Sequence, residues 1–599
     1  MRTENVTMKP ERNADSLGAI RISRKKLLRL GAAALGLLIG GPLLKRSTVE
    51  ASDSEPCTLL KNGLIVDGAG KTGFTGCVLI KGGRIEEVSE SPISAEAASF
   101  RPAADIDCQT LDCTGKVVAP GFIDAHSHMD WILPLRGRDE LKLPFIAQGC
   151  TTFVAGNCGF GVAGFRKSSA HKKELAPGLF PNVEMPWDTM AEYYGHLRGA
   201  GMSHNIATLA GHGTIRASMR GMDPSPLTDD EMKELLSLLE RAMDEGAIGV
   251  SLGLQYAPGL FATMDEIKRV AQLAKSKDKI LAVHGRAYSI LSAEYPINPF
   301  GPPHNLLALD EMIGVARETG VRLQYSHLMF AGTKSHGTYQ QCLAAIDAAI
   351  AGGIDVQTDS YPYHCGNSIL GVIMPKWFRE NLPDNYHNPE ALKRLETELM
   401  ALSMLVGLSY PDIQITSVAH SGFKQYEGMF LSDIAQKRGR SPFETFIELA
   451  EKSGERDTRV LLHNYSNMEI IDALMQYPAC LFMTDALPGK ENRNPASYGT
   501  FPLFLQYARD RNRLSLEQAI RKMTGATADR FRLKERGYLR KGMAADITVF
   551  DWRTVKDNTN PTEFDRFPTG IEAVFMNGKQ VLQDGKVNAQ ALAGQPLQA

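Results

Sequence analysis

Short apolar runs alternate with helix-like segments through the middle of the chain, and this alternation limits the fold more than any other feature. Eight such runs occupy residues 119–125, 151–156, 205–210, 248–253, 280–284, 322–327, 354–359 and 480–485. Apolar residues between the runs recur at helical spacing, as in 227–243, where Thr228 is the expected helix N-cap. Strands that alternate with helices indicate parallel βα units. Eight units predict an α/β fold of the (β/α)8 TIM-barrel type.

The spacing of the last two runs predicts an insertion in this barrel. More than a hundred residues separate the seventh run from the eighth, which is too long for a loop. We therefore expect an inserted subdomain between strands seven and eight, at about residues 366–450.

Both ends of the chain have the pattern of short strands joined by tight turns. Residues 57–118 contain Asn62-Gly63 and Gly82-Gly83, and residues 544–582 contain Asn577-Gly578, all of which are hairpin signals. Two strand-rich ends around one α/β body predict a small β-sandwich domain built from both. The expected domains are a first β-part at 52–118, the barrel at 119–535, and a second β-part with a tail at 536–599.

The first fifty residues have the pattern of an export signal. A charged segment, Ser23-Arg-Lys-Lys-Leu-Leu28, precedes an apolar segment rich in Gly, Ala and Leu, and 1–51 is the predicted signal peptide. The charged segment resembles a twin-arginine signal, with Lys25 in place of the second arginine. We expect export to the periplasm of a bacterium; the alternative is an uncleaved signal that anchors the protein in the membrane. No other apolar run is long enough to span a bilayer.

Charge and cysteine usage exclude several classes of protein. The net charge is −2, from 66 basic and 68 acidic residues, without a basic patch for nucleic acid, so a small-molecule substrate is expected and no nucleic acid.

The nine cysteines form no CxxC pair, which argues against zinc-ribbon and thioredoxin folds. In an oxidising compartment some would pair, for example Cys108 with Cys113, and Cys158 is the expected free thiol. The oligomeric state is not indicated.

Potential metal ligands stand at the C-terminal ends of five of the eight runs. His126 and His128 share one face because residues i and i+2 of a strand point the same way. The other candidates each follow a run of their own: Cys158, His284, His327 and Asp485. Any one of them alone has an ordinary explanation, such as a surface histidine or a buried core cysteine. Because the active site of such a barrel lies at these strand ends, the set together predicts a zinc site.

This ligand set predicts hydrolytic chemistry. Zinc polarises a carbonyl group and lowers the pKa of a bound water towards about 7. A nearby carboxylate can then take the proton of that water and pass it to a leaving nitrogen, and Asp485 is the candidate for this general base and acid. The alternative is that Asp485 is only a ligand or a helix N-cap.

The motifs around these residues resemble those of the amidohydrolase superfamily. The segment Ala119-Pro-Gly-Phe-Ile-Asp-Ala-His-Ser-His128 carries the general resemblance. More narrowly, Gly149-Cys-Thr-Thr-Phe-Val-Ala-Gly-Asn-Cys-Gly159 resembles the N-acyl-D-amino-acid deacylases, or D-aminoacylases. Further matching motifs lie at 211–216, 359–363, 498–502 and 522–525, and the resemblance runs from about Leu59 to Leu582.

The resemblance implies a division of the ligands between two metal positions. Cys158, His284 and His327 would hold a tightly bound zinc. A second, weaker or empty position would be formed by His126, His128 and Asp485. Asp485 would act as general base and then acid, and the reaction would release a carboxylate and a free D-amino acid from an N-acyl substrate.

The chain departs from this family pattern where the substrate would bind. Met329 stands where a lysine is usual, and Ala496 where an arginine is usual, so two cations expected near the substrate carboxylate are absent from these positions. Three arginines are candidates to compensate: Arg216, Arg286 and Arg493. Tyr361 and Asn367, after the seventh run, are candidate substrate contacts with an equally good structural explanation.

Two alternative functions remain open. One keeps the metal chemistry and changes the substrate to a neutral N-acyl amine, a cyclic amide, a carbamoyl group or a lactone. The other is a non-catalytic binding protein that keeps the barrel fold. The first predicts metal-dependent turnover of a different bond, and the second predicts none.

Overall fold

The computed structural model describes residues 56–598 except 91–107, 176–179, 181–182, 293, 297, 299, 456, 488–493 and 561–562. The chain separates into two compact units, Met1–Ser54 and Glu55–Ala599, and everything below concerns the second. The predicted signal peptide, residues 1–51, lies outside the described residues. Within the part that is described, none of the helices is both long and apolar enough to cross a membrane.

A strand forms within each of the apolar runs of the central region. The strands are β6 (Phe122–Asp124), β7 (Cys150–Ala155), β8 (Asn205–Thr208) with β9 (Ala210–Gly211), β10 (Gly249–Gly253), β11 (Ile280–His284), β12 (Arg322–Tyr325), β13 (Val356–Ser360) and β17 (Cys480–Phe482). They pair in parallel as two sheets, in the orders β6-β7-β8 and β17-β13-β12-β11-β10-β9.

Two short links connect these sheets at their edges. Only Leu209 separates β8 from β9 along the chain. At the other edges, the Ala125 N–H donates a hydrogen bond of 3.3 Å to the carbonyl oxygen of Phe482. The C-terminal ends of all these strands therefore point to a common side, where the predicted ligands follow them.

Amphipathic helices connect the strands and bury their apolar faces. They are α2 (Met190–Ala200), α3 (His212–Arg220), α4 (Asp229–Asp244), α5 (Met264–Ser276), α6 (His304–Thr319), α7 (Tyr339–Ala351), α12 (Met468–Gln476), α13 (Ala496–Arg511), α14 (Leu516–Lys522) and α15 (Gly525–Phe531), with the short α1 (Leu143–Ala147) before β7. In α4, Thr228 caps the first turn by accepting the Glu231 N–H, while Glu231 reaches back to the cap. The buried residues of α4 recur every three or four positions, as in Met232, Leu235 and Leu239.

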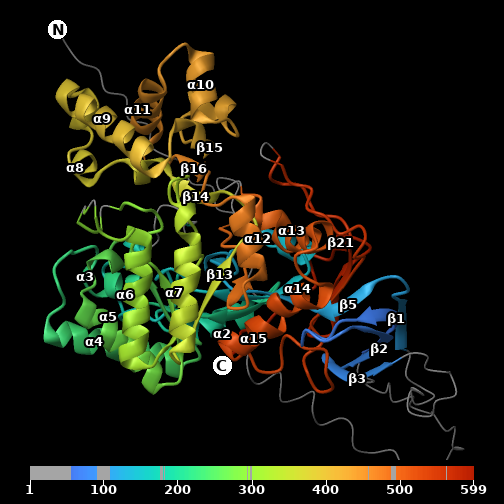
Figure 1. Cartoon of the computed structure of the whole chain (residues 1–599). Helices are drawn as coiled ribbons and strands as arrows, with labels where there is room; N and C mark the ends of the chain where they lie inside the picture. Colours follow the sequence, from blue (N-terminus) through green and yellow to red (C-terminus); the bar gives the residue numbers. More distant parts are fainter. Residues whose placement is uncertain are drawn as a thin grey trace, which may run out of the picture. The chain divides into compact units, whose positions relative to one another are not determined.

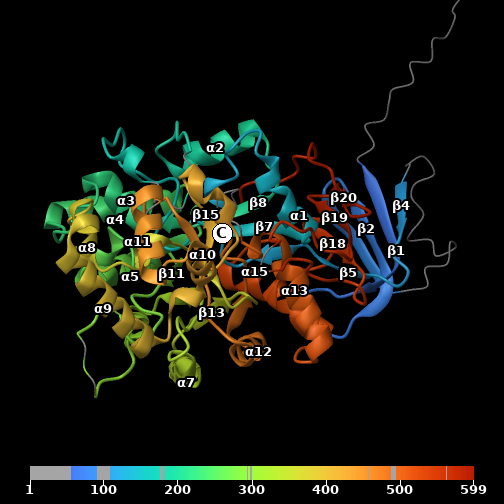
Figure 2. The same ribbon diagram turned by 90° about the horizontal axis from the view of Figure 1, so that it is seen from above.

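The two ends of the described chain meet in one nine-stranded sheet (Figure 1, Figure 2). From the N-terminal side come β1 (Cys57–Ile65), β2 (Phe74–Lys81), β3 (Arg84–Glu90), β4 (Cys108–Asp112) and β5 (Val117–Pro120); from the C-terminal side come β18 (Ile547–Phe550), β19 (Ile571–Met576), β20 (Lys579–Gln583) and β21 (Lys586–Val587). Strand β5 pairs with β1 on one edge and with β18 on the other, which joins both halves. The strand pairing thus joins strands from both chain ends in one hydrogen-bonded sheet.

Two local predictions at the N-terminal side were wrong. Asn62-Gly63 is not a hairpin turn: it lies inside β1, where the register with β2 shifts and Asn62 has a φ of 63°. This is a β-bulge, which uses the same residue types as a turn. The disulfide joins Cys108 to Cys57, because β1 and β4 are parallel and place these two residues opposite each other. Cys113 is buried and free.

An insertion with its own core follows β13. Strands β14 (Gly366–Ile369), β16 (Arg459–Leu462) and β15 (Ile413–Ser417) form an antiparallel sheet, accompanied by α8 (Lys376–Arg379), α9 (Pro389–Val406), α10 (Leu431–Arg438) and α11 (Pro442–Ser453). Leu395, Ile415, Phe446 and Val460 are among the residues of its separate hydrophobic cluster. Because β16 pairs with β14, these elements extend to Leu462, past the predicted end near residue 450.

Candidate active site

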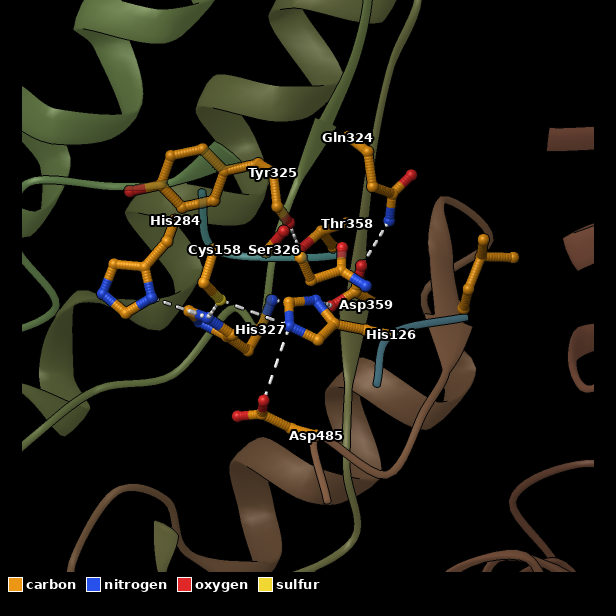
Figure 3. Close-up of polar contacts among 12 residues, drawn as sticks. His126, Cys158, His284, Gln324, Tyr325, Ser326, His327, Thr358, Asp359 and Asp485 are labelled. Carbon is orange, nitrogen blue, oxygen red and sulfur yellow. Dashed lines mark hydrogen bonds and ion pairs between the residues drawn. The ribbon is translucent and has the colours of Figure 1, made fainter. Parts of the chain in front are cut away.

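The structure brings all six predicted ligands together at the C-terminal ends of the parallel strands. His126 and His128 follow β6, Cys158 follows β7, His284 ends β11, His327 follows β12 and Asp485 follows β17. Figure 3 shows five of these side chains converging. The histidines and the cysteine are at most 6% exposed, whereas the side chain of Asp485 is 26% exposed.

One group of atoms combines a sulfur with imidazole nitrogens. Cys158 Sγ lies 3.4 Å from His126 Nε2 and 3.4 Å from His327 Nε2. His327 Nε2 is in turn 2.8 Å from His284 Nδ1. Thiolate sulfur and imidazole nitrogen are ligand types that zinc prefers, and these atoms are close enough to share one ion with little movement.

A second group adds a carboxylate. Asp485 Oδ1 lies 3.4 Å from His126 Nε2 and 3.6 Å from His128 Nε2. Each of two triads, His126–Cys158–His327 and His126–His128–Asp485, has its ligand atoms within 4.8 Å of one another. His126 therefore belongs to both groups, which makes one continuous site of the two.

An outer contact determines which nitrogen of His284 faces the site. His284 Nε2 is 3.0 Å from the side-chain oxygen of Gln255, a residue in the loop after β10. Because an amide oxygen only accepts, Nε2 must carry the proton, and Nδ1 keeps a free electron pair for a metal. Gln255 was not among the site residues predicted from the sequence. Its position two residues after the run 248–253 was the available signal.

Three of the ligands have a backbone conformation that non-glycine residues rarely adopt. The φ angles are 54° at Cys158, 33° at His327 and 47° at Asp485. Such strain costs about 1–3 kcal/mol per residue and persists at functional sites where surrounding contacts enforce it. The Cys158 backbone packs closely against Gly253, where an added Cβ would lie 2.0 Å from the Cys158 carbonyl oxygen. At Asp485 the backbone N–H donates to His126 O over 3.0 Å.

Burial and charge give the two acidic ligands opposite protonation preferences. Burial raises the pKa of the Cys158 thiol well above its usual value, and the charges of Asp485 and Asp359 raise it further. A metal cation would reverse this preference, since a coordinated thiol is deprotonated. Burial also acts to raise the pKa of Asp485, but His128, His126 and His327 outweigh it and lower that pKa to about 2. Asp485 is therefore an ionised carboxylate at neutral pH.

The two candidate substrate contacts lie in different surroundings. Tyr361, just after β13, is 7% exposed, and its hydroxyl lies 3.7 Å from the sulfur of Met329. Burial, followed by the charge of Asp485, raises the Tyr361 pKa, so this phenol lies within the field of the ionised carboxylate. Asn367 is on β14 and pairs with Leu461 of β16, which makes it part of the inserted sheet.

Two of the three arginines proposed to replace the missing cations have other partners. Arg286 pairs with Glu311 and donates to two backbone carbonyls, those of Leu260 and Ala262. Arg216 pairs with Glu266 and donates to the carbonyls of Asp223 and Ser225. Arg493 lies outside the described residues. Ala496 is 3% exposed and begins α13, with its N–H bound by the side chain of Asn494.

Comparison with known proteins places the chain in a family. The model of the Amidohydrolase family matches residues 109–377 and 432–582. A D-aminoacylase of Alcaligenes xylosoxydans xylosoxydans is 32% identical over 551 residues, covering 91% of this chain and 97% of the relative.

Solved structures agree with this match. A D-aminoacylase with a binuclear metal centre has a TM-score of 0.72 at 28% identity, covering 90% of this chain and 99% of its own. An N-acyl-D-glutamate deacylase from Bordetella bronchiseptica, complexed with zinc and a phosphonate inhibitor, has a TM-score of 0.72 at 26% identity, covering 91% and 100%. With a family match over more than half of its length and the ligand geometry described above, this chain belongs to the amidohydrolase family.

Proposed function

We propose that this protein is a zinc-dependent hydrolase that cleaves the amide bond of an N-acylated D-amino acid. The observation that carries the proposal is that Cys158 Sγ and Asp485 Oδ1 each lie 3.4 Å from Nε2 of His126, which joins the two ligand groups. The D-aminoacylase and N-acyl-D-glutamate deacylase relatives support the reaction class.

The residues divide between holding the metal and moving protons. Cys158, His284 and His327 are proposed to hold one zinc tightly, and His126, His128 and Asp485 to form a second, weaker position. When bound, zinc supplies Lewis acidity, which polarises the substrate carbonyl and makes a water molecule more acidic. The four histidines are at most 6% exposed, which limits the access of bulk water to their ring nitrogens.

Asp485 is proposed as the general base and then the general acid. Its low pKa leaves the carboxylate free to accept a proton from the attacking water at Oδ1 or Oδ2. As the carbonyl carbon–nitrogen bond breaks, that proton passes to the leaving nitrogen. The products are the free amine of the amino acid and the acyl group as a carboxylic acid, which releases the remaining proton of the water to solvent and becomes a carboxylate, with Asp485 returned to its ionised form.

The proposal includes an architecture and a location. We propose that the two parallel sheets form one (β/α)8 barrel, that the nine-stranded sheet is a β-domain made by both chain ends, and that 366–462 is an inserted subdomain. We also propose export to the periplasm after removal of residues 1–51. The Cys57–Cys108 disulfide supports export, because such bonds persist in oxidising compartments.

A second substrate class has specific support. Met329 contacts the Tyr361 hydroxyl through its sulfur, and Arg216 and Arg286 are engaged in ion pairs of their own. A substrate carboxylate would lose charge-assisted contacts worth about 1.5–3 kcal/mol each if no other cation replaced them. These observations favour a neutral N-acyl amine as the alternative substrate.

One experiment separates the candidates. Mature protein (residues 52–599) is stripped of metal, reloaded with zinc and assayed on N-acyl-D-amino acids, their L forms, their methyl esters and neutral N-acyl amines. Zinc-dependent cleavage that is selective for the D-acids supports the first proposal. Cleavage of esters and neutral amides alone would move the substrate but keep the chemistry. Zinc binding without any turnover would contradict both and favour a binding protein.

A further inference from the structure

A buried carboxylate that the proposed reaction does not use lies beside two of the predicted ligands. Asp359, on β13, is 0% exposed. Its Oδ1 accepts the backbone N–H of His327 over 2.6 Å and lies 3.6 Å from Nδ1 of His126. One oxygen atom therefore faces a ligand of the Cys158 group and the histidine that both groups share (Figure 3).

Each of these two contacts bears on a feature that metal binding needs. His327 has a φ of 33°, and the short bond from its N–H to Asp359 helps to hold that strained backbone in place. His126 presents Nε2 to the site, so its proton belongs on Nδ1, which has no hydrogen-bond partner among the described residues. A carboxylate near Nδ1–H favours this tautomer and makes the imidazole a better ligand.

The direction of the Asp359 carboxylate is itself determined by a buried chain of side chains. Its Oδ2 accepts from Gln324 Nε2 over 2.6 Å, and Gln324 Oε1 accepts from Arg530 Nε over 3.0 Å. Arg530, on α15, also pairs with Asp355 and donates to the carbonyl of Leu323. A guanidinium group only donates, so Gln324 must face it with the oxygen and face Asp359 with the NH2 group.

We propose that Asp359 is a positioning residue that aligns His126 and His327 for metal binding, with Gln324 and Arg530 fixing its orientation. The inference rests on the proposed metal site but not on the identity of the substrate. It concerns a network that begins on α15, near the end of the proposed barrel domain, and reaches the ligands through β12 and β13.

The hydrogen bonds of Asp359 predict that one substitution will place two donors opposite each other and that a second substitution will restore the pairing. Asp359→Asn replaces one acceptor oxygen with a donor, which must then oppose either the Gln324 NH2 group or the His327 N–H. Gln324 cannot turn to relieve this, because Arg530 requires its oxygen. Combining Asp359→Asn with Gln324→Glu restores an acceptor opposite the new donor, and the introduced carboxylate still accepts from Arg530. The double variant should therefore recover what the single variant loses.

The test measures metal binding on the apo full-length mature protein rather than turnover. Zinc affinity is determined by competition with a chelator, and the ligand field by the absorption spectrum of the Co²⁺ form. Asp359→Asn should lower zinc affinity by about 10–100-fold and change the Co²⁺ spectrum, and the double variant should restore most of both. Thr358→Val is the matched control: it removes a neighbouring buried hydrogen bond, from the Thr358 hydroxyl to the carbonyl of Tyr325, and leaves the Asp359 carboxylate in place.

The outcomes separate this inference from the proposed function. Unchanged zinc affinity and spectrum in Asp359→Asn would overturn it, even with a lowered melting temperature, and would leave the amidase proposal intact. Loss of affinity with rescue in the double variant supports it, even if the wild type cleaves none of the acyl substrates. Should Asp359→Asn fail to fold, Gln324→Met, which keeps the carboxylate without its support, must show the lower affinity. A wild type that takes up no divalent metal would overturn both.

Discussion

The two sides of the site differ in chemistry and in access. Cys158, His284 and His327 offer only sulfur and nitrogen, are at most 5% exposed, and have contacts between donor atoms of 2.8–3.4 Å. The other side consists of His126, His128 and Asp485, touches the first through the contact of His126 with Cys158, has contacts of 3.4–3.6 Å between its own donor atoms, and ends in the partly exposed carboxylate of Asp485. Cys158, His284 and His327 form what we call the closed side, whose sulfur and nitrogen donors suit a resident zinc. His126, His128 and Asp485 form the open side, whose carboxylate suits a group that must exchange protons with water and substrate.

The largest expected effect comes from removing the closed side. Cys158→Ala deletes the sulfur that contacts both His126 and His327. We expect zinc affinity to fall by more than the about 10–100-fold that the loss of an outer hydrogen-bond partner costs, and activity to disappear with the metal. Metal analysis after dialysis and assays at several zinc concentrations check this. Cys342→Ala, at a buried free cysteine of α7, is the control and should keep its zinc.

The second prediction concerns a change on the open side that leaves the ligands of the closed side in place. Asp485→Asn keeps the shape but loses the base, so we expect kcat to fall by about 10²–10⁴-fold while one zinc remains bound. Steady-state kinetics and metal analysis on the same preparation measure both. Full activity in this variant would refute the assignment of Asp485 as the base, and loss of zinc along with activity would erase the distinction between the two sides.

The same contrast separates what the sequence could predict from what it could not. Placing the six ligands together required only that each follow an apolar run, since parallel strands put those positions on one side. The position of Gln255 after a run placed it near the strand ends, but its contact with His284 depends on loop geometry. The contacts of Asp359 depend on the register between β12 and β13, which no local pattern encodes. The Cys57–Cys108 disulfide is likewise non-local, joining residues 51 apart, so a pairing of near neighbours was the wrong expectation.

A smaller effect should follow from disturbing the closed side indirectly. In Gly253→Ala the added Cβ would lie 2.0 Å from the Cys158 carbonyl oxygen, so the loop after β7 must shift. We expect weaker zinc binding with Asp485 chemistry preserved, seen as activity that recovers when zinc is raised. Gly314→Ala in α6, where a Cβ meets nothing within 4 Å, is the control, and it should gain about 0.5–1 kcal/mol of unfolding free energy without change in zinc affinity. Equal zinc binding in Gly253→Ala and wild type would show that this contact does not hold Cys158.

The smallest expected effect tests whether Asp485 can be both ligand and base. A second cation bound by His126, His128 and Asp485 would stabilise the ionised carboxylate, whose pKa is already about 2, and make it a poorer proton acceptor. Titrating zinc into the apo protein should therefore raise activity to a maximum and then lower it by a few fold. His128→Asn, which weakens only the open side, should reduce the later decline more than the initial rise. A plateau that persists at excess zinc in the wild type would mean either that the open side takes no second metal or that Asp485 remains free to act beside it. Metal analysis at the plateau decides between these, because only the second predicts more than one zinc per chain.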